Sequence, residues 1–213
     1  MKPIATPVWV LALLVIAVIA LVILLWSSKR RRRPKLKLEP TGLENLTPSI
    51  AGLTSATIVQ GNRIELVQNG AMWDRLFADF ESARETINYE TFLAKEGELT
   101  RRLTEVLCRK AKEGVQVRVL LDGSGGKKFG KDSLSKFADA CVNVGHYHPT
   151  RISNLGRLNN RDHRKIAIID GRIGYVGGHC LTDEWLGEAQ DKKHFRDISE
   201  FVDELKQIAE RKD

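Results

Sequence analysis

The chain alternates between two hydrophobic periods from residue 57 to residue 121, and this alternation constrains its fold more than any other feature. Apolar residues recur at every second position in strand-like stretches and at every third or fourth position between them. The predicted strands are 57–67 (a hairpin or two short strands), 85–93 and 115–121, and the predicted helices are 71–84 and 99–111. The order strand, helix, strand, helix, strand predicts an α/β fold, with a mixed sheet covered by helices.

An apolar run dominates the N-terminal part. It extends from Val8 to Trp26, 19 residues without a charge. A helix of this length crosses a hydrocarbon core of ~30 Å, and Trp9 and Trp26 would lie at its two interfaces. A cleaved signal peptide is the alternative, but its apolar core is usually ~7–15 residues long and follows basic residues. We therefore expect a single, uncleaved transmembrane helix at 8–26.

Residues 29–37, which we call the basic collar, follow this run. The collar holds seven Lys and Arg, whereas only Lys2 precedes the run. The positive-inside rule then predicts a single-pass protein of the inner (cytoplasmic) membrane, with the following domain on the cytoplasmic side. The collar fixes topology, and a further role in attracting anionic headgroups stays open. Residues 38–56 contain Pro and Gly without a sustained period and predict a linker.

The charge outside the N-terminal part is nearly balanced. The chain has 34 Lys and Arg against 27 Asp and Glu, but eight of the basic residues and none of the acids lie in residues 1–37. The remaining residues carry 26 basic and 27 acidic side chains, which gives no argument for a nucleic-acid partner. Three cysteines, an odd number, fit a reducing compartment better than a disulfide framework.

The chemistry is concentrated after residue 162. His163 and Lys165 precede a short apolar run, Asp170 and Gly171 close that run as a hairpin turn, and a glycine pair follows at 177–178. In a strand, side chains alternate, so His163 and Lys165 would share one face, a nucleophile or base beside a cation. The preceding segment, 124–161, is expected to be rich in loops.

The pattern H-x-K-x4-D-x6-G-G resembles the signature of the phospholipase D superfamily, and residues 177–185 resemble the bacterial cardiolipin synthase branch. The resemblance covers residues 57–197 and implies one phospholipase D-like half-domain. It implies the catalytic residues His163, Lys165 and Asp170. His163 would attack phosphorus and form a phosphohistidine, Lys165 would hold the phosphoryl oxygens, and Asp170 would support the local backbone more than the chemistry. The resemblance implies no metal and no other cofactor.

Further residues are assigned supporting or substrate-binding roles by the same resemblance. A histidine nucleophile needs a partner on its other ring nitrogen, and Asp197 is the first choice for this, with Glu184 the second. Independently of the resemblance, Arg164 would add positive potential beside His163 together with Arg157 and Arg161, either for anionic headgroups or as part of a solvated basic loop. The remaining assignments are the glycine pair Gly177 and Gly178, and Cys180, which stands where relatives commonly carry Asn.

The H-x-K motif occurs once, whereas members of this branch carry two and build one site from both. Residues 198–213 show an apolar spacing that predicts an amphipathic helix.

Three interpretations of the function follow from the family resemblance and the single motif. The chain is a phosphatidyltransferase of cardiolipin synthase type that joins two phosphatidylglycerols, completed by a homodimer or a complementing second half. Alternatively, it is a truncated, non-catalytic half-enzyme, or a membrane-tethered phosphodiesterase or nuclease. The expected partners are an anionic phospholipid substrate and the membrane, without nucleic acid.

Overall fold

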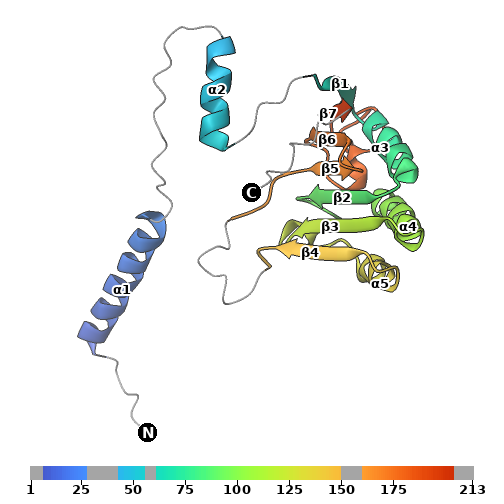
Figure 1. The fold of residues 1–213 in the computed structure, drawn as a ribbon. Coiled ribbons are helices and arrows are strands. Elements are labelled where there is room, and N and C mark those ends of the chain that lie inside the picture. Colours follow the sequence, from blue (N-terminus) through green and yellow to red (C-terminus); the bar gives the residue numbers. More distant parts are fainter. Residues whose placement is uncertain (1–6, 28–42, 56–60, 150–159, 204–213) are drawn as a thin grey trace, which may run out of the picture. The chain divides into compact units, whose positions relative to one another are not determined.

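The computed structural model describes residues 7–27, 43–55, 61–149 and 160–203, with side chains described at 7–24 and 46–55 in the first two ranges. The chain divides into two compact units, residues 1–56 and 57–213 (Figure 1).

The first unit contains two helices, α1 (Val8–Ser27) and α2 (Leu43–Thr54). The apolar side chains of α1 are exposed from Val8 to Leu24, except that Val10 is half-buried. Nowhere in the described ranges is a helix both long enough and apolar enough to cross a membrane. The structure therefore does not support the transmembrane helix expected at 8–26. Part of the expected linker, 38–56, is the helix α2 instead, with Pro48 inside it.

The second unit is built on a seven-stranded mixed sheet with the order β1-β7-β6-β5-β2-β3-β4. The strands β2, β3 and β4 are parallel neighbours, and the other neighbouring pairs are antiparallel. The strands are β1 (Arg63–Gln68), β2 (Thr86–Thr91), β3 (Gln116–Asp122), β4 (Asn143–Tyr147), β5 (Ile166–Ile169), β6 (Ile173–Gly177) and β7 (Ile198–Asp203). The mixed sheet predicted from the sequence is confirmed.

Three helices pack on the sheet, α3 (Ala71–Ser82), α4 (Glu98–Lys112) and α5 (Lys131–Asp139). Figure 1 shows them side by side along the sheet, as expected when successive right-handed crossovers proceed in one direction. The core lies between these helices and the sheet. In β2 the predicted alternation holds, because Ile87, Tyr89 and Thr91 are buried.

The expectation that 124–161 is mostly loop is wrong for its first part. A 3₁₀ turn, η1 (Gly125–Lys127), is followed by α5 and β4, which complete a second parallel crossover after β3. Phe137 on α5 and Phe129 before it are fully buried, with ring centroids 5.5 Å apart. Burial of these two rings provides the apolar surface that holds the segment on the sheet.

The expected C-terminal helix, 198–213, is also corrected, since residues 198–203 form β7. This strand pairs with β1 on one side and β6 on the other. Ser199 and Phe201 are buried while Ile198 is 49% exposed, which is the two-residue period of a strand. Backbone pairing on both edges outweighed a short helical spacing. Residues 204–213, and the partner strand expected at 57–59, lie outside the described residues.

Candidate active site

Four segments meet at the end of the sheet where β2 and β3 finish and β5 begins. Ala94, just beyond β2, donates its N–H to the carbonyl of Gly125 after β3 (3.2 Å). Lys95 donates to Leu181, and Leu181 donates to Leu93, both at 3.0 Å. The segment 160–165 leads into β5 at the same end, because β5 runs antiparallel to β2. The signature histidine therefore lies among loops held by backbone hydrogen bonds.

His163 and Lys165 precede β5 and are not part of it, in contrast to the expectation from the sequence. They are nevertheless adjacent. The ammonium of Lys165 lies 3.4 Å from His163 Nδ1 and donates to the His163 carbonyl at 2.5 Å. The exposed imidazole stacks on Phe92, with ring centroids 4.0 Å apart and planes 27° apart. The structure thus pairs a reachable ring nitrogen with a cation.

Asp170 lies in the hairpin between β5 and β6, where the predicted turn is confirmed. Asp170 and Gly171 both have positive φ, and Arg172 N–H donates to Ile169 at 2.9 Å. The carboxylate accepts three backbone N–H groups, from residues 84, 85 and 86, at 2.8–2.9 Å. Burial raises the pKa of this carboxyl, but the three hydrogen bonds outweigh burial and hold the pKa below its usual range. This geometry agrees with a backbone-supporting role.

The glycine pair at the end of β6 allows β7 to pass closely. A Cβ on Gly177 would lie 2.1 Å from Ser199 Oγ, and a Cβ on Gly178 would lie 2.4 Å from both carboxylate oxygens of Asp197. Cys180 beyond them is buried. Burial raises the pKa of its thiol. The charge of Asp197 raises this pKa further, and the charge of Lys165 lowers it in part. Lys165 and Asp197 thus both lie within electrostatic reach of Cys180.

The two carboxylates expected to orient His163 have other partners. Glu184, on the 3₁₀ turn η3 (Asp183–Trp185), lies 2.5 Å from the ammonium of Lys95, which lowers the pKa of Glu184 to about 2. Asp197 accepts the indole N–H of Trp185 at 2.9 Å and the N–H of Ile198 at 2.9 Å. The orienting role of either residue stays a prediction.

Arg164 was expected to add positive potential beside His163, but its guanidinium is paired with acidic groups instead. Its guanidinium binds both carboxylate oxygens of Asp162 (2.9 and 3.0 Å) and lies 2.9 Å from Glu90 Oε1. The Arg164 hydrogen bonds hold the pKa of Asp162 at about 2. Burial, followed by the neighbouring Asp162, raises the pKa of Glu90 to about 7. Arg164 therefore neutralises an acidic pair.

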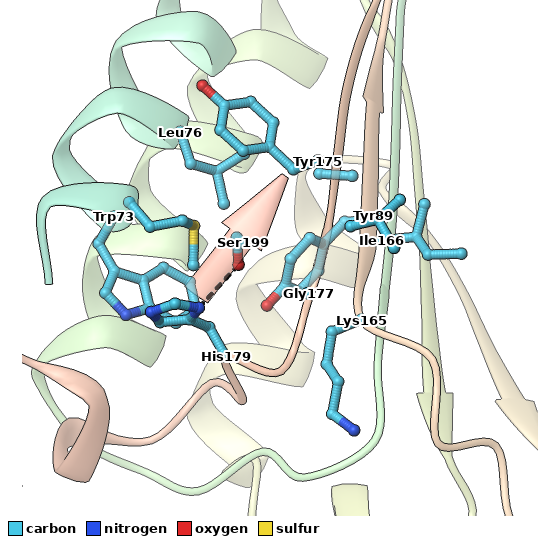
Figure 2. Close-up of a pocket in the computed structure, with 12 residues that line it drawn as sticks. Trp73, Leu76, Tyr89, Lys165, Ile166, Tyr175, Gly177, His179 and Ser199 are labelled. Carbon is cyan, nitrogen blue, oxygen red and sulfur yellow. Dashed lines mark hydrogen bonds between the residues drawn. The ribbon is translucent and has the colours of Figure 1, made fainter. Parts of the chain in front are cut away.

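A small cavity of ≈ 20 Å³ lies behind Lys165, large enough for one water molecule (Figure 2). Figure 2 shows Lys165 at one end of this cavity and the hydrogen-bonded pair His179 and Ser199 on its wall, with their side chains 2.7 Å apart. His179 Nε2 lies 2.9 Å from the Asn69 carbonyl, which can only accept, so Nε2 carries the proton. Burial lowers the pKa of His179. This buried histidine is held at both ring nitrogens and forms part of the wall behind Lys165.

Sequence reasoning missed Phe92, Asp122 and His179. Asp122 is 1% exposed and accepts the N–H groups of Ser124 and Gly125 at 2.9 and 2.8 Å. Those two amides are therefore committed to Asp122, and the glycine-rich loop 123–126 is not arranged to cradle a phosphate. A buried acid at the carboxyl end of a parallel strand was the available signal.

Known proteins resemble this chain over most of residues 57–213. A family model described as "Cardiolipin synthase, PLD-like domain" matches residues 76–212, a range that includes β7. The "Major cardiolipin synthase ClsA" of Bacillus subtilis (strain 168) is 36% identical over 144 residues, covering 67% of this chain and 30% of that protein. A cardiolipin synthase of Listeria monocytogenes serotype 4a (strain HCC23) is 37% identical over 144 residues, which again cover 67% of this chain and 30% of that protein. The chain thus spans about a third of the length of these relatives.

Two solved structures share the fold. Nuc from Salmonella typhimurium, a phospholipase D family member, superposes with a TM-score of 0.51 at 13% identity, covering 68% of this chain and 85% of that one. NucT from Helicobacter pylori gives a TM-score of 0.50 at 15% identity, covering 68% and 87%. At these identities the likeness concerns the fold alone.

Proposed function

The chain belongs to the PLD-like domain family of cardiolipin synthases, and we propose that it transfers a phosphatidyl group from one phosphatidylglycerol to another, forming cardiolipin and releasing glycerol. The exposed ring of His163 beside the ammonium of Lys165 carries this proposal. Such a pair supplies a nucleophile and a point charge for the phosphoryl oxygens. An anionic phospholipid is the matching substrate class.

The reaction proceeds in two steps. In the first, a ring nitrogen of His163 bonds to phosphorus while the bond from phosphorus to the glycerol headgroup breaks, and a general acid protonates the leaving alkoxide. In the second, the same group, now a base, takes the proton of a hydroxyl on the second phosphatidylglycerol. That oxygen bonds to phosphorus, the phosphorus–nitrogen bond breaks, and His163 is restored. Lys165 offsets the negative charge of the phosphoryl oxygens in both steps.

A second histidine is needed as the general acid and base, and the H-x-K motif occurs once in this sequence. We propose that a second copy of the chain, or a complementing second polypeptide, supplies it. In a homodimer the two His163 side chains would face each other, and each would serve in turn for the other. Because the second histidine would come from another chain, the oligomeric state is the first property to measure.

The test uses the full chain purified in detergent. Its mass is measured, phosphatidylglycerol is supplied, and cardiolipin, glycerol and acid-labile phosphohistidine are quantified. We expect a dimer whose cardiolipin synthesis is abolished by His163→Ala, with Lys112→Ala, on the far end of α4, as a surface control. A monomer that forms neither cardiolipin nor phosphohistidine would identify a non-catalytic half. Cleavage of DNA that depends on His163, without lipid turnover, would identify a nuclease.

A further inference from the structure

We propose that Asp122 is a positioning residue for His163. Its buried carboxylate ties the segment 162–165 to the end of β3 and thereby sets the imidazole of His163 against Phe92. The role of His163 as nucleophile rests on the proposed function, whereas the tie itself is a property of the fold.

The two oxygens of Asp122 have separate tasks. Oδ1 accepts the N–H groups of Ser124 and Gly125 and so shapes the loop after β3. Oδ2 accepts the N–H of Asp162 at 3.0 Å, although that residue lies 40 positions further along the chain. The guanidinium of Arg161 lies 3.9 Å from Oδ1. A single carboxylate that is 1% exposed therefore fixes the backbone immediately before His163.

The same carboxylate also fixes the surface on which His163 lies. The loop shaped by Oδ1 packs tightly against the Phe92 segment, since a Cβ on Gly125 would lie 2.1 Å from the Phe92 carbonyl oxygen. Gly125 in turn accepts the N–H of Ala94 at 3.2 Å. Phe92 is thus placed through Oδ1 and His163 through Oδ2, and Asp122 sets both rings of the stack.

The neighbours of His163 in the chain are fixed independently of it. The side chains of Asp162 and Arg164 bind each other through two hydrogen bonds, and the Arg164 guanidinium also lies 2.9 Å from Glu90 on β2. His163 contacts Phe92 and Lys165 instead. With the backbone held at Asp162 and the flanking side chains engaged elsewhere, the imidazole has little freedom to leave Phe92. A nucleophile held in one orientation is what an in-line attack requires.

Asp122→Asn tests the tie with almost no change in volume. The amide oxygen can still accept from Ser124 and Gly125, but the amide nitrogen cannot accept the N–H of Asp162. With isotope-labelled histidine in the full chain, we expect the ring protons of His163 to be shifted upfield by the Phe92 ring. In D122N the upfield shift should be lost, so that the His163 resonances fall at the chemical shifts measured in a Phe92→Leu variant. If the chain is active, kcat should fall about 100-fold with little change in KM.

Asp183→Asn is the matched control, because its carboxylate also joins distant segments, accepting the N–H groups of Glu98 and Leu99 at 2.8 and 3.0 Å. This variant should keep the His163 shift. A folded D122N with an unchanged shift overturns the proposal, as does rapid hydrogen exchange of the Asp162 amide in the unmodified chain, which needs no variant. The shift does not depend on turnover, so failure of the proposed function and failure of this inference are separable.

Discussion

At the scale of single residues, the glycines at the end of β6 show how closely β7 approaches the site. A side chain at Gly177 would meet Ser199 Oγ at 2.1 Å and the Ser199 backbone at 2.7 Å. The backbone of a paired strand cannot move aside without breaking its ladder hydrogen bonds. Because Ser199 also binds His179, crowding at Gly177 would disturb the wall of the cavity behind Lys165.

Gly177→Ala should therefore lower the free energy of unfolding of the domain by about 1–3 kcal/mol, the usual cost of overpacking. Urea denaturation measures this change. Gly145→Ala on β4 is the control, since its Cβ would meet the movable end of Leu120 at 3.2 Å. Equal losses in the free energy of unfolding for the two substitutions would contradict a tight approach of β7 to Gly177.

Glu90 predicts a pH dependence of stability. Its pKa is raised to about 7 by burial and by the neighbouring Asp162, above the value near 4.3 of an unfolded chain. The folded state therefore binds this proton more tightly, so the stabilisation is fully present below about pH 4.3 and is lost as the pH rises through 7. Glu90→Gln should remove this fall in Tm and match the unmodified chain at low pH. If Tm falls with rising pH equally in Glu90→Gln and in the unmodified chain, Glu90 is not the source of the pH dependence.

At the scale of elements, the hairpin of β5 and β6 is held by Asp170. Asp170→Ala leaves three backbone N–H groups without their acceptor and should lower the free energy of unfolding by about 3 kcal/mol, whereas Asp170→Asn, which keeps one acceptor oxygen, should cost about 1 kcal/mol. The folded pKa is lowered, so the contribution is present above about pH 4 and is lost below it. The difference from the unmodified chain should shrink in acid, as measured by urea titration at several pH values.

The strand β7 gives a second test at this scale. Phe201→Ala should cost about 3–5 kcal/mol because the ring is buried against Tyr175, with ring centroids 5.2 Å apart. Ile198→Lys should change the free energy by less than about 0.5 kcal/mol, since Ile198 is exposed. A helical stripe would bury both residues and make both substitutions costly. Thermal unfolding separates the two patterns.

At the scale of the whole molecule, the uneven charge predicts binding to anionic membranes. The basic collar holds seven Lys and Arg, whereas residues 38–213 are nearly neutral. Replacing Arg30, Arg31, Arg32 and Arg33 by Gln should weaken binding to phosphatidylglycerol vesicles by up to about three orders of magnitude, at about 1 kcal/mol per residue. Co-sedimentation measures this. Gln at four exposed basic residues of α4 and α5 (Arg101, Lys112, Lys131 and Lys136) provides the control. The effect at the collar should decrease with added salt.

The sequence by itself determined the α/β class, the helices α3 and α4, the strands β2 and β3, and the adjacency of His163 and Lys165. These are local properties. Hydrophobic period depends on residues a few positions apart, and two side chains separated by one residue stay neighbours in any extended backbone. The hairpin turn at Asp170 was predictable for the same reason, because a positive φ at two successive positions selects particular residues.

Only the tertiary structure decided which distant groups share a hydrogen bond. Residues 198–203 became a strand because β1 and β6 offered unpaired backbone on both sides. Arg164 turned to Asp162 and Glu90, and Asp122 captured the amide of Asp162, because the strand order places β2, β3 and the segment before β5 at one end of the sheet. Such pairings depend on proximity in space, which a linear pattern does not encode.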